Sequence, residues 1–78
     1  MKKEIIPRDV VLGLPVVTIV GNSCVHIENY KKIVEINSQK IRVETKKGVV
    51  VIAGKGLVMS YYNDCDLSIE GFIQHIEL

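Results

Sequence analysis

The sequence contains little leucine and alanine, few aromatic residues and no long apolar run. Leu and Ala together number 6 of 78 residues, whereas Val and Ile together number 23. Helical bundles need the opposite mixture, because β-branched side chains lose rotamer freedom in a helix and fit a pleated strand. Prolines and charges interrupt the N-terminal apolar stretch, so residues 10–20 are too short to cross a bilayer as a helix. The composition predicts an all-β chain.

The length and the charge balance point to one small domain. A chain of 78 residues with net charge +1 has room for a single core, and catalytic domains with deep clefts usually need more chain. We therefore expect one domain over residues 1–78, with an N-terminal arm at 1–15 and a repeat region at 16–78. Ile5 and Ile6 follow two lysines, but no small-residue cleavage site comes after them. The expected location is the cytoplasm.

The residue types that bind metals and cofactors are too few for a site. Cys24 and Cys65 form no CxxC pair and cannot supply a zinc site alone, so we interpret both as small buried strand residues. The segment Gly54-Lys55-Gly56 lacks the strand-to-helix context of a phosphate loop, and Asp64-Cys65-Asp66 lacks the ligand count of a calcium loop. No metal, cofactor or catalytic residue is predicted.

A small hydrolase or ligand-binding protein is one hypothesis that the histidines leave open. His26 and His75 are the only candidate general bases, and no Ser or Cys stands with a His and a carboxylate in a recognisable arrangement. His26 lies between two apolar residues and is expected on the solvent face of a strand. Both histidines are better explained as solvent-facing strand residues.

The charges are unevenly distributed along the chain. Residues 30–55 carry a net charge of +5, and residues 56–78 carry −4 with no Lys or Arg. The Lys-rich middle suggests a nucleic-acid-binding module as an alternative function. Among the aromatic residues only Tyr30 borders the basic stretch, and the total charge is only +1, so nucleic acid is an unfavoured partner. The split also suits head-to-tail contact between copies.

The apolar residues follow a repeat of 16 to 17 residues. The pattern apolar-x-Ile-x-(Gly/Ser) occurs four times, and each copy is followed by a second short apolar-alternating segment. The small closing residues permit tight corners in a strand. The four copies are Val17–Gly21, Val34–Ser38, Val50–Gly54 and Leu67–Gly71, with corners at Gly21, Ser38, Gly54 and Gly71.

Two architectures fit these four strand–corner–strand units. Stacked in register, the copies form a small β-solenoid with internal apolar columns, which the identity of the columns favours. Alternatively, Thr45-Lys46-Lys47-Gly48 closes an ordinary hairpin, and the chain forms an antiparallel β-roll or sandwich folded at the glycine corners. We prefer the solenoid slightly. Val51 and Ala53 make the outer face of the third copy apolar, as expected of a contact surface.

The order and spacing of these motifs resemble a known family. The stretches Pro7-Arg-Asp-Val-Val-Leu-Gly13, Val17-Thr-Ile-Val-Gly-Asn22, Val25-His-Ile-Glu-Asn29, Ile41-Arg-Val-Glu-Thr45, Ile52-Ala-Gly54 and Ile69-Glu-Gly-Phe-Ile73 resemble the YabP/YqfC family of sporulation proteins in endospore-forming Firmicutes. The resemblance implies a sporulation protein of the mother-cell compartment. It also implies association with a larger membrane protein, YqfD, and so a peripheral position at the membrane through that partner. The family motif carries no catalytic residue.

We therefore expect a non-enzymatic structural or adaptor protein that acts through protein–protein binding or self-assembly as a homo-oligomer. The last strand runs to the end of the sequence without a polar tail, so Ile73 and Ile76 are candidate interaction residues at a strand edge. Glu28 and Asn29 are less obliged by strand structure than their neighbours and are further candidates. A strand-end turn is the simpler explanation of those two.

Overall fold

The computed structural model describes residues 13–78, and every regular element in that range is a β-strand. This confirms the all-β prediction. The strands are β1 (Val16–Val20), β2 (Cys24–Glu28), β3 (Tyr30–Ile36), β4 (Lys40–Thr45), β5 (Gly48–Tyr62) and β6 (Asp66–Glu77). Residues 1–12 of the expected N-terminal arm lie outside the described residues. Over residues 13–78 there is no helix long and apolar enough to cross a membrane.

The six strands form one open antiparallel sheet in the order β1-β2-β6-β5-β4-β3. The two long strands β5 and β6 lie at the centre of the sheet, with the hairpin β1–β2 on one side and the hairpin β3–β4 on the other. Thr45 pairs with Gly48, so the expected hairpin between β4 and β5 is present. The connection between β4 and β5 has two residues, which is the commonest length for a hairpin between antiparallel strands. The short connection makes β4 and β5 pair with each other.

The preference for a β-solenoid is corrected by this topology. A solenoid would pair equivalent positions of successive copies, but Val17 lies opposite Ile27 and Val50 lies opposite Val43. Copies one and two are the hairpins β1–β2 and β3–β4, whereas copies three and four are the long strands β5 and β6. The four units have similar lengths, and every strand alternates its side chains with a period of two residues. These two features alone produce the repeated sequence pattern, so the repeat does not require the units to stack in register.

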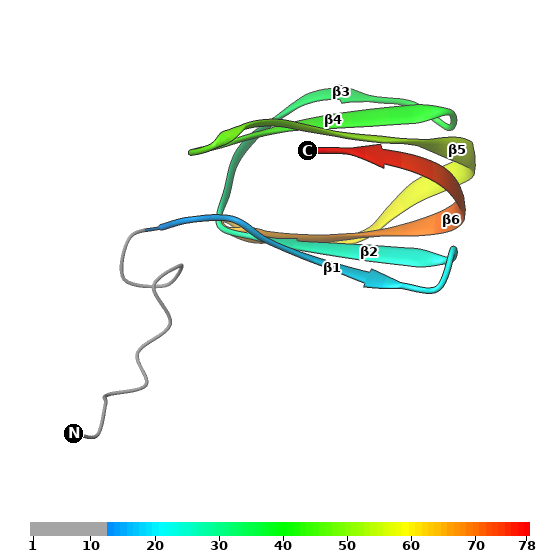
Figure 1. Ribbon diagram of the computed structural model, residues 1–78, viewed down its shortest axis with the longest axis horizontal. Helices are drawn as coiled ribbons and strands as arrows, with labels where there is room; N and C mark the ends of the chain where they lie inside the picture. The colour runs from blue at the N-terminus through cyan, green and yellow to red at the C-terminus, as the bar shows by residue number, and fades with distance from the viewer. Residues whose placement is uncertain (1–12) are drawn as a thin grey trace, which may run out of the picture.

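Bending of β5 and β6 divides the sheet into two packed layers (Figure 1). The first layer contains β1, β2, the first part of β6 (residues 66–70) and the last part of β5 (residues 58–62). The second layer contains β3, β4, the first part of β5 and the last part of β6 (residues 72–77). The described chain is thus an antiparallel sheet folded over on itself, as in the alternative architecture.

Two of the predicted corners, Gly54 and Gly71, lie inside the long strands where the sheet bends. A Cβ on Gly54 would lie 2.1 Å from the carbonyl oxygen of Phe72, and one on Gly71 would lie 2.6 Å from the carbonyl oxygen of Gly56. The pairing of β5 with β6 shifts register between Ala53 and Gly54. The two long strands therefore cross too closely at the bend for any side chain. The other two corners, Gly21 and Ser38, lie in the hairpin turns after β1 and β3.

The core lies between the layers and is aliphatic. Its buried members are Val25, Ile27, Ile41, Val43, Val50, Ile52, Leu57, Leu67, Ile69 and Ile73. Ile19 and Ile36 face the same side, because they lie directly opposite the buried Val25 and Ile41. They are nevertheless 51% and 53% exposed, since β1 and β3 are the outermost strands. The core is therefore incompletely covered at both ends of the sheet.

Candidate interaction edges

The last part of β6 forms a free strand edge, which we call the C-terminal edge (residues 72–77). The pairing of β2 with β6 ends at Glu70, and the backbone N–H of Ile73 donates to the carbonyl of Asn22 at 2.8 Å. Beyond that point β6 pairs with β5 on one side, and no strand of residues 13–78 pairs with its other side. Such a row of unpaired backbone groups can accept a strand from another chain.

The structure separates the two predicted edge residues. Ile73 is 7% exposed and belongs to the core, so it does not offer a binding surface. Ile76 is half-buried, lies opposite Ile52 and packs against the core from its margin. Sequence reasoning placed both side chains at the edge because the last strand continues to the end of the sequence without a polar tail. The register shifts between β5 and β6 change which of them is covered.

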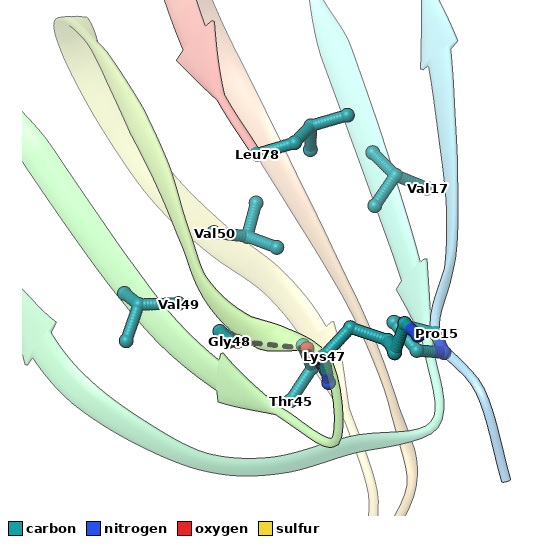
Figure 2. Close-up of a pocket in the computed structure, with 8 residues that line it drawn as sticks. All are labelled: Pro15, Val17, Thr45, Lys47, Gly48, Val49, Val50 and Leu78. Atoms are coloured by element: carbon teal, nitrogen blue, oxygen red, sulfur yellow. Dashed lines mark hydrogen bonds between the residues drawn. The ribbon is translucent and has the colours of Figure 1, made fainter.

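An apolar cavity of about 300 Å³ adjoins the end of this edge (Figure 2). It lies between the start of β1, the β4–β5 hairpin and the last residue of the chain. Lys47 and Leu78 both line it, and Leu78 is 82% exposed. A strand added to the C-terminal edge would pass this cavity and could place an apolar side chain in it. The apolar lining consists of Pro15, Val17, Val49, Val50 and Leu78.

Glu28 and Asn29 lie where the chain crosses from the first layer to the second. Asn29 has a positive φ of 66°, and its side-chain Nδ2 donates to the carbonyl of Leu14 at 2.8 Å. The backbone N–H groups of Asn29 and Tyr30 both donate to the carbonyl of Cys65. Asn29 therefore holds three segments together, as a strand-end turn would. Glu28 is half-buried and lies opposite Asp66 on the outer face.

The two histidines lie apart on the outer faces of the two layers. His26 is half-buried, and its Nδ1 lies 2.7 Å from the hydroxyl oxygen of Ser68, its direct partner across β2 and β6. Sequence reasoning did not find this pair, because the two residues are 42 positions apart. His75 is exposed and lies opposite Ala53 in the second layer. Within residues 13–78 no three His, Cys, Asp or Glu side chains gather as metal ligands.

The prediction that both cysteines are buried strand residues is wrong for Cys65. Cys65 is exposed in the turn between β5 and β6, and Cys24 is half-buried in β2; both are free thiols. The negative charge of Asp66 raises the pKa of the Cys65 thiol, and partial desolvation and Asp64 add to this effect. A raised pKa lowers the thiolate fraction at neutral pH, so Cys65 is less reactive there than an exposed thiol without acidic neighbours.

We expect the substitution Asp66→Asn to accelerate alkylation of Cys65 several-fold at neutral pH. Removal of the nearest carboxylate lowers the thiol pKa and raises the thiolate fraction. The measurement is the rate of iodoacetamide labelling of Cys65 across a pH series, with mass spectrometry of the labelled peptide. Asp64→Asn is the matched control and should give a smaller increase. Equal rates in Asp66→Asn and the unsubstituted protein would contradict the assignment.

The basic middle segment does not form an uninterrupted cationic surface. Lys32 lies 3.8 Å from Glu44, and Arg42 lies 3.3 Å from Glu35, on the outer face of β3 and β4. Tyr30 is half-buried against the core, and its hydroxyl donates to the carbonyl of Asn63 at 2.6 Å. Acidic neighbours thus offset two of the cations, and Tyr30 is occupied by other contacts. This geometry disfavours the nucleic-acid alternative.

Comparison with known proteins agrees with the resemblance noted in the motifs. The model of the YabP family matches residues 14–78, which include all six strands. A protein of Bacillus subtilis (strain 168), named uncharacterized protein YqfC, is 32% identical over 68 residues. The matched region spans 87% of this chain and 73% of that protein. With a family match over nearly the whole described fold, this chain belongs to the YabP family.

Proposed function

We propose that this chain is a non-enzymatic structural or adaptor protein in endospore formation, and that it acts by binding another protein at the C-terminal edge. The observation that carries the proposal is the side of β6 that pairs with no described strand beyond Ile73, beside the apolar cavity at Leu78. A partner strand there would satisfy backbone groups and cover apolar surface in one step. Membership of a sporulation-associated family supplies the cellular context.

The proposed partner is the membrane sporulation protein YqfD, and the proposed location is the mother-cell compartment of a sporulating cell. The chain would then lie at the membrane only through this partner. Lys47, which lines the otherwise apolar cavity, favours a partner segment that is apolar with a flanking acidic residue. Main-chain pairing would give affinity, and the cavity would give selectivity for one side chain.

The substitutions Ile76→Asp and Leu78→Asp test this proposal. Each places a carboxylate at the C-terminal edge or its cavity, and we expect each to weaken binding at least about tenfold, because an apolar contact is replaced by a desolvated charge. The measurement is the mass of the complex with the soluble part of YqfD, by light scattering over a dilution series.

Two controls make this test decisive. Ile76 is half-buried, so Ile76→Asp can also reduce stability, whereas Leu78 is 82% exposed and its substitution leaves the core intact. Val34→Asp changes an exposed apolar residue on β3, away from the C-terminal edge, and should leave the complex unchanged. If folded Leu78→Asp protein binds with unaltered affinity, the C-terminal edge is not the binding surface.

A further inference from the structure

Within residues 13–78, two more edges of the first layer pair with no strand, and neither carries a charge. One is β1, the outermost strand, with sequence Val-Val-Thr-Ile-Val. The other, which we call the β5 free edge, is residues 58–62 with sequence Val-Met-Ser-Tyr-Tyr; β4 pairs with β5 only as far as Ala53. Val20 and Val58 are each 56% exposed, and both tyrosines of the β5 free edge are more than half exposed.

The outermost strand of the second layer, β3, has features that protect an edge strand against pairing with another chain. β3 carries Lys31, Lys32 and Glu35, and its register with β4 shifts twice. Charges and bulges on an edge strand prevent pairing with another chain. β1 and the β5 free edge have no charged residue, and β1 pairs with β2 over five successive positions without a register shift. β1 therefore lacks both kinds of protection, whereas the β5 free edge lacks charges but shifts register with β6 between Met59 and Tyr61.

The sequence of β1 matches that of the strand already paired with residues 58–62. On its occupied side, that segment lies opposite Leu67-Ser-Ile-Glu70, with Glu70 opposite Val58 and Ile69 opposite Met59. β1 carries Val17-Thr-Ile-Val20, the same repeat unit with the same closing glycine. A second strand of this pattern would thus fit the free side of the same segment in the same register, with core-facing side chains on one face.

We propose that this chain self-associates head to tail, with β1 of one copy adding to the β5 free edge of the next. Val20 then lies opposite Val58, Ile19 opposite Met59 and Thr18 opposite Tyr61. Ile19 faces the core side through its pair with Val25, and Met59 does so through its pair with Ile69. The half-exposed Ile19 is covered in the assembly by an apolar neighbour of the next copy, which supplies the driving force.

The direction of the strands permits repeated addition. Successive strands of the first layer alternate in direction, because each of its pairings is antiparallel. The layer has four strands, so a copy moved sideways without inversion presents β1 antiparallel to the β5 free edge. The two surfaces are different, so the contact is heterologous and each new copy leaves one of each edge open. The inference rests on the proposed binding role but uses a second copy and other edges.

The test uses two lysine variants of the full chain. Val20→Lys blocks β1, and Val58→Lys blocks the β5 free edge; both positions are exposed, so folding should be unaffected. We expect the unsubstituted protein to grow in mass with concentration by light scattering, and each variant alone to remain a single chain. Val34→Lys on the already charged β3 is the matched control and should assemble as the unsubstituted protein does.

Mixing the two variants distinguishes the head-to-tail contact from a symmetric one. The Val58→Lys chain retains an intact β1, and the Val20→Lys chain retains an intact β5 free edge, so an equimolar mixture should form a one-to-one dimer and nothing larger. An unsubstituted protein that stays a single chain at every concentration, a Val20→Lys variant that still assembles, or a mixture that stays monomeric would each overturn the proposal. Leu78→Asp should assemble normally, which separates failure of this contact from failure at the C-terminal edge.

Discussion

Gly54→Ala is expected to cost on the order of 3 to 5 kcal/mol of unfolding free energy and to leave much of the protein unfolded at physiological temperature. The added methyl group would meet the Phe72 carbonyl oxygen at 2.1 Å and the Cα of Ile73 at 3.1 Å. Those atoms are backbone, so no side-chain rotation relieves the contact and the crossing strands must separate. A domain of 78 residues has a total stability of about 4 to 12 kcal/mol, and this loss is a large share of it.

Gly21→Ala is the control for this experiment. Gly21 has a positive φ of 56°, and a Cβ there would meet no atom within 4 Å. Its substitution should cost only about 1 to 2 kcal/mol, from backbone strain alone. Urea unfolding of both variants, followed by circular dichroism, gives the comparison. Equal losses in the two variants would show that the close crossing of β5 and β6 at Gly54 does not exist.

Local chemistry explains the features of the fold that could be predicted from sequence. The excess of Val and Ile specifies strands, and Thr45 to Gly48 specifies a hairpin. The small residues at 54 and 71 mark bends because nothing larger fits there. The strand order could not be predicted in the same way. Pairing of β2 with β6 joins segments about 40 residues apart, and an apolar alternation fits many partners equally well.

The candidate site could also be predicted only in part: its place on the last strand was predictable, but the burial of its individual residues was not. The C-terminal edge followed from an apolar last strand without a polar tail, but the burial of Ile73 depends on register shifts that no local motif indicates. The β5 free edge was missed, although a signal existed: residues 56–62 contain no charge, between Lys55 and Asp64. The hydrogen bond between His26 and Ser68 was beyond sequence reasoning, because it depends entirely on the pairing of β2 with β6.

Ile69→Ala is expected to destabilise the protein by about 2 to 5 kcal/mol, whereas Ile19→Ala should cost less than about 1 kcal/mol. Both residues hold the isoleucine position of the same repeat, in Leu67–Gly71 and Val17–Gly21. Ile69 is fully buried between β2 and β5, so its truncation leaves a cavity in the core. Ile19 lies on the outermost strand and is half exposed, so its truncation removes few contacts within one chain.

The comparison of these two variants discriminates between the folded sheet and an in-register stack, because a stack would bury the isoleucine column uniformly and give similar losses at both positions. Denaturant unfolding at low protein concentration measures the single-chain effect, and Ile36→Ala on β3 should match Ile19→Ala, since it is also half exposed on an outermost strand.

At high protein concentration, the proposed self-association through β1 also stabilises the folded protein. Ile19 is then covered by the next copy, so Ile19→Ala should lose stability relative to the unsubstituted protein as concentration rises, while Ile36→Ala should not. If the stability difference between Ile19→Ala and the unsubstituted protein stays the same at every concentration, β1 does not make the contact, whereas the low-concentration comparison still distinguishes the folded sheet from a stack.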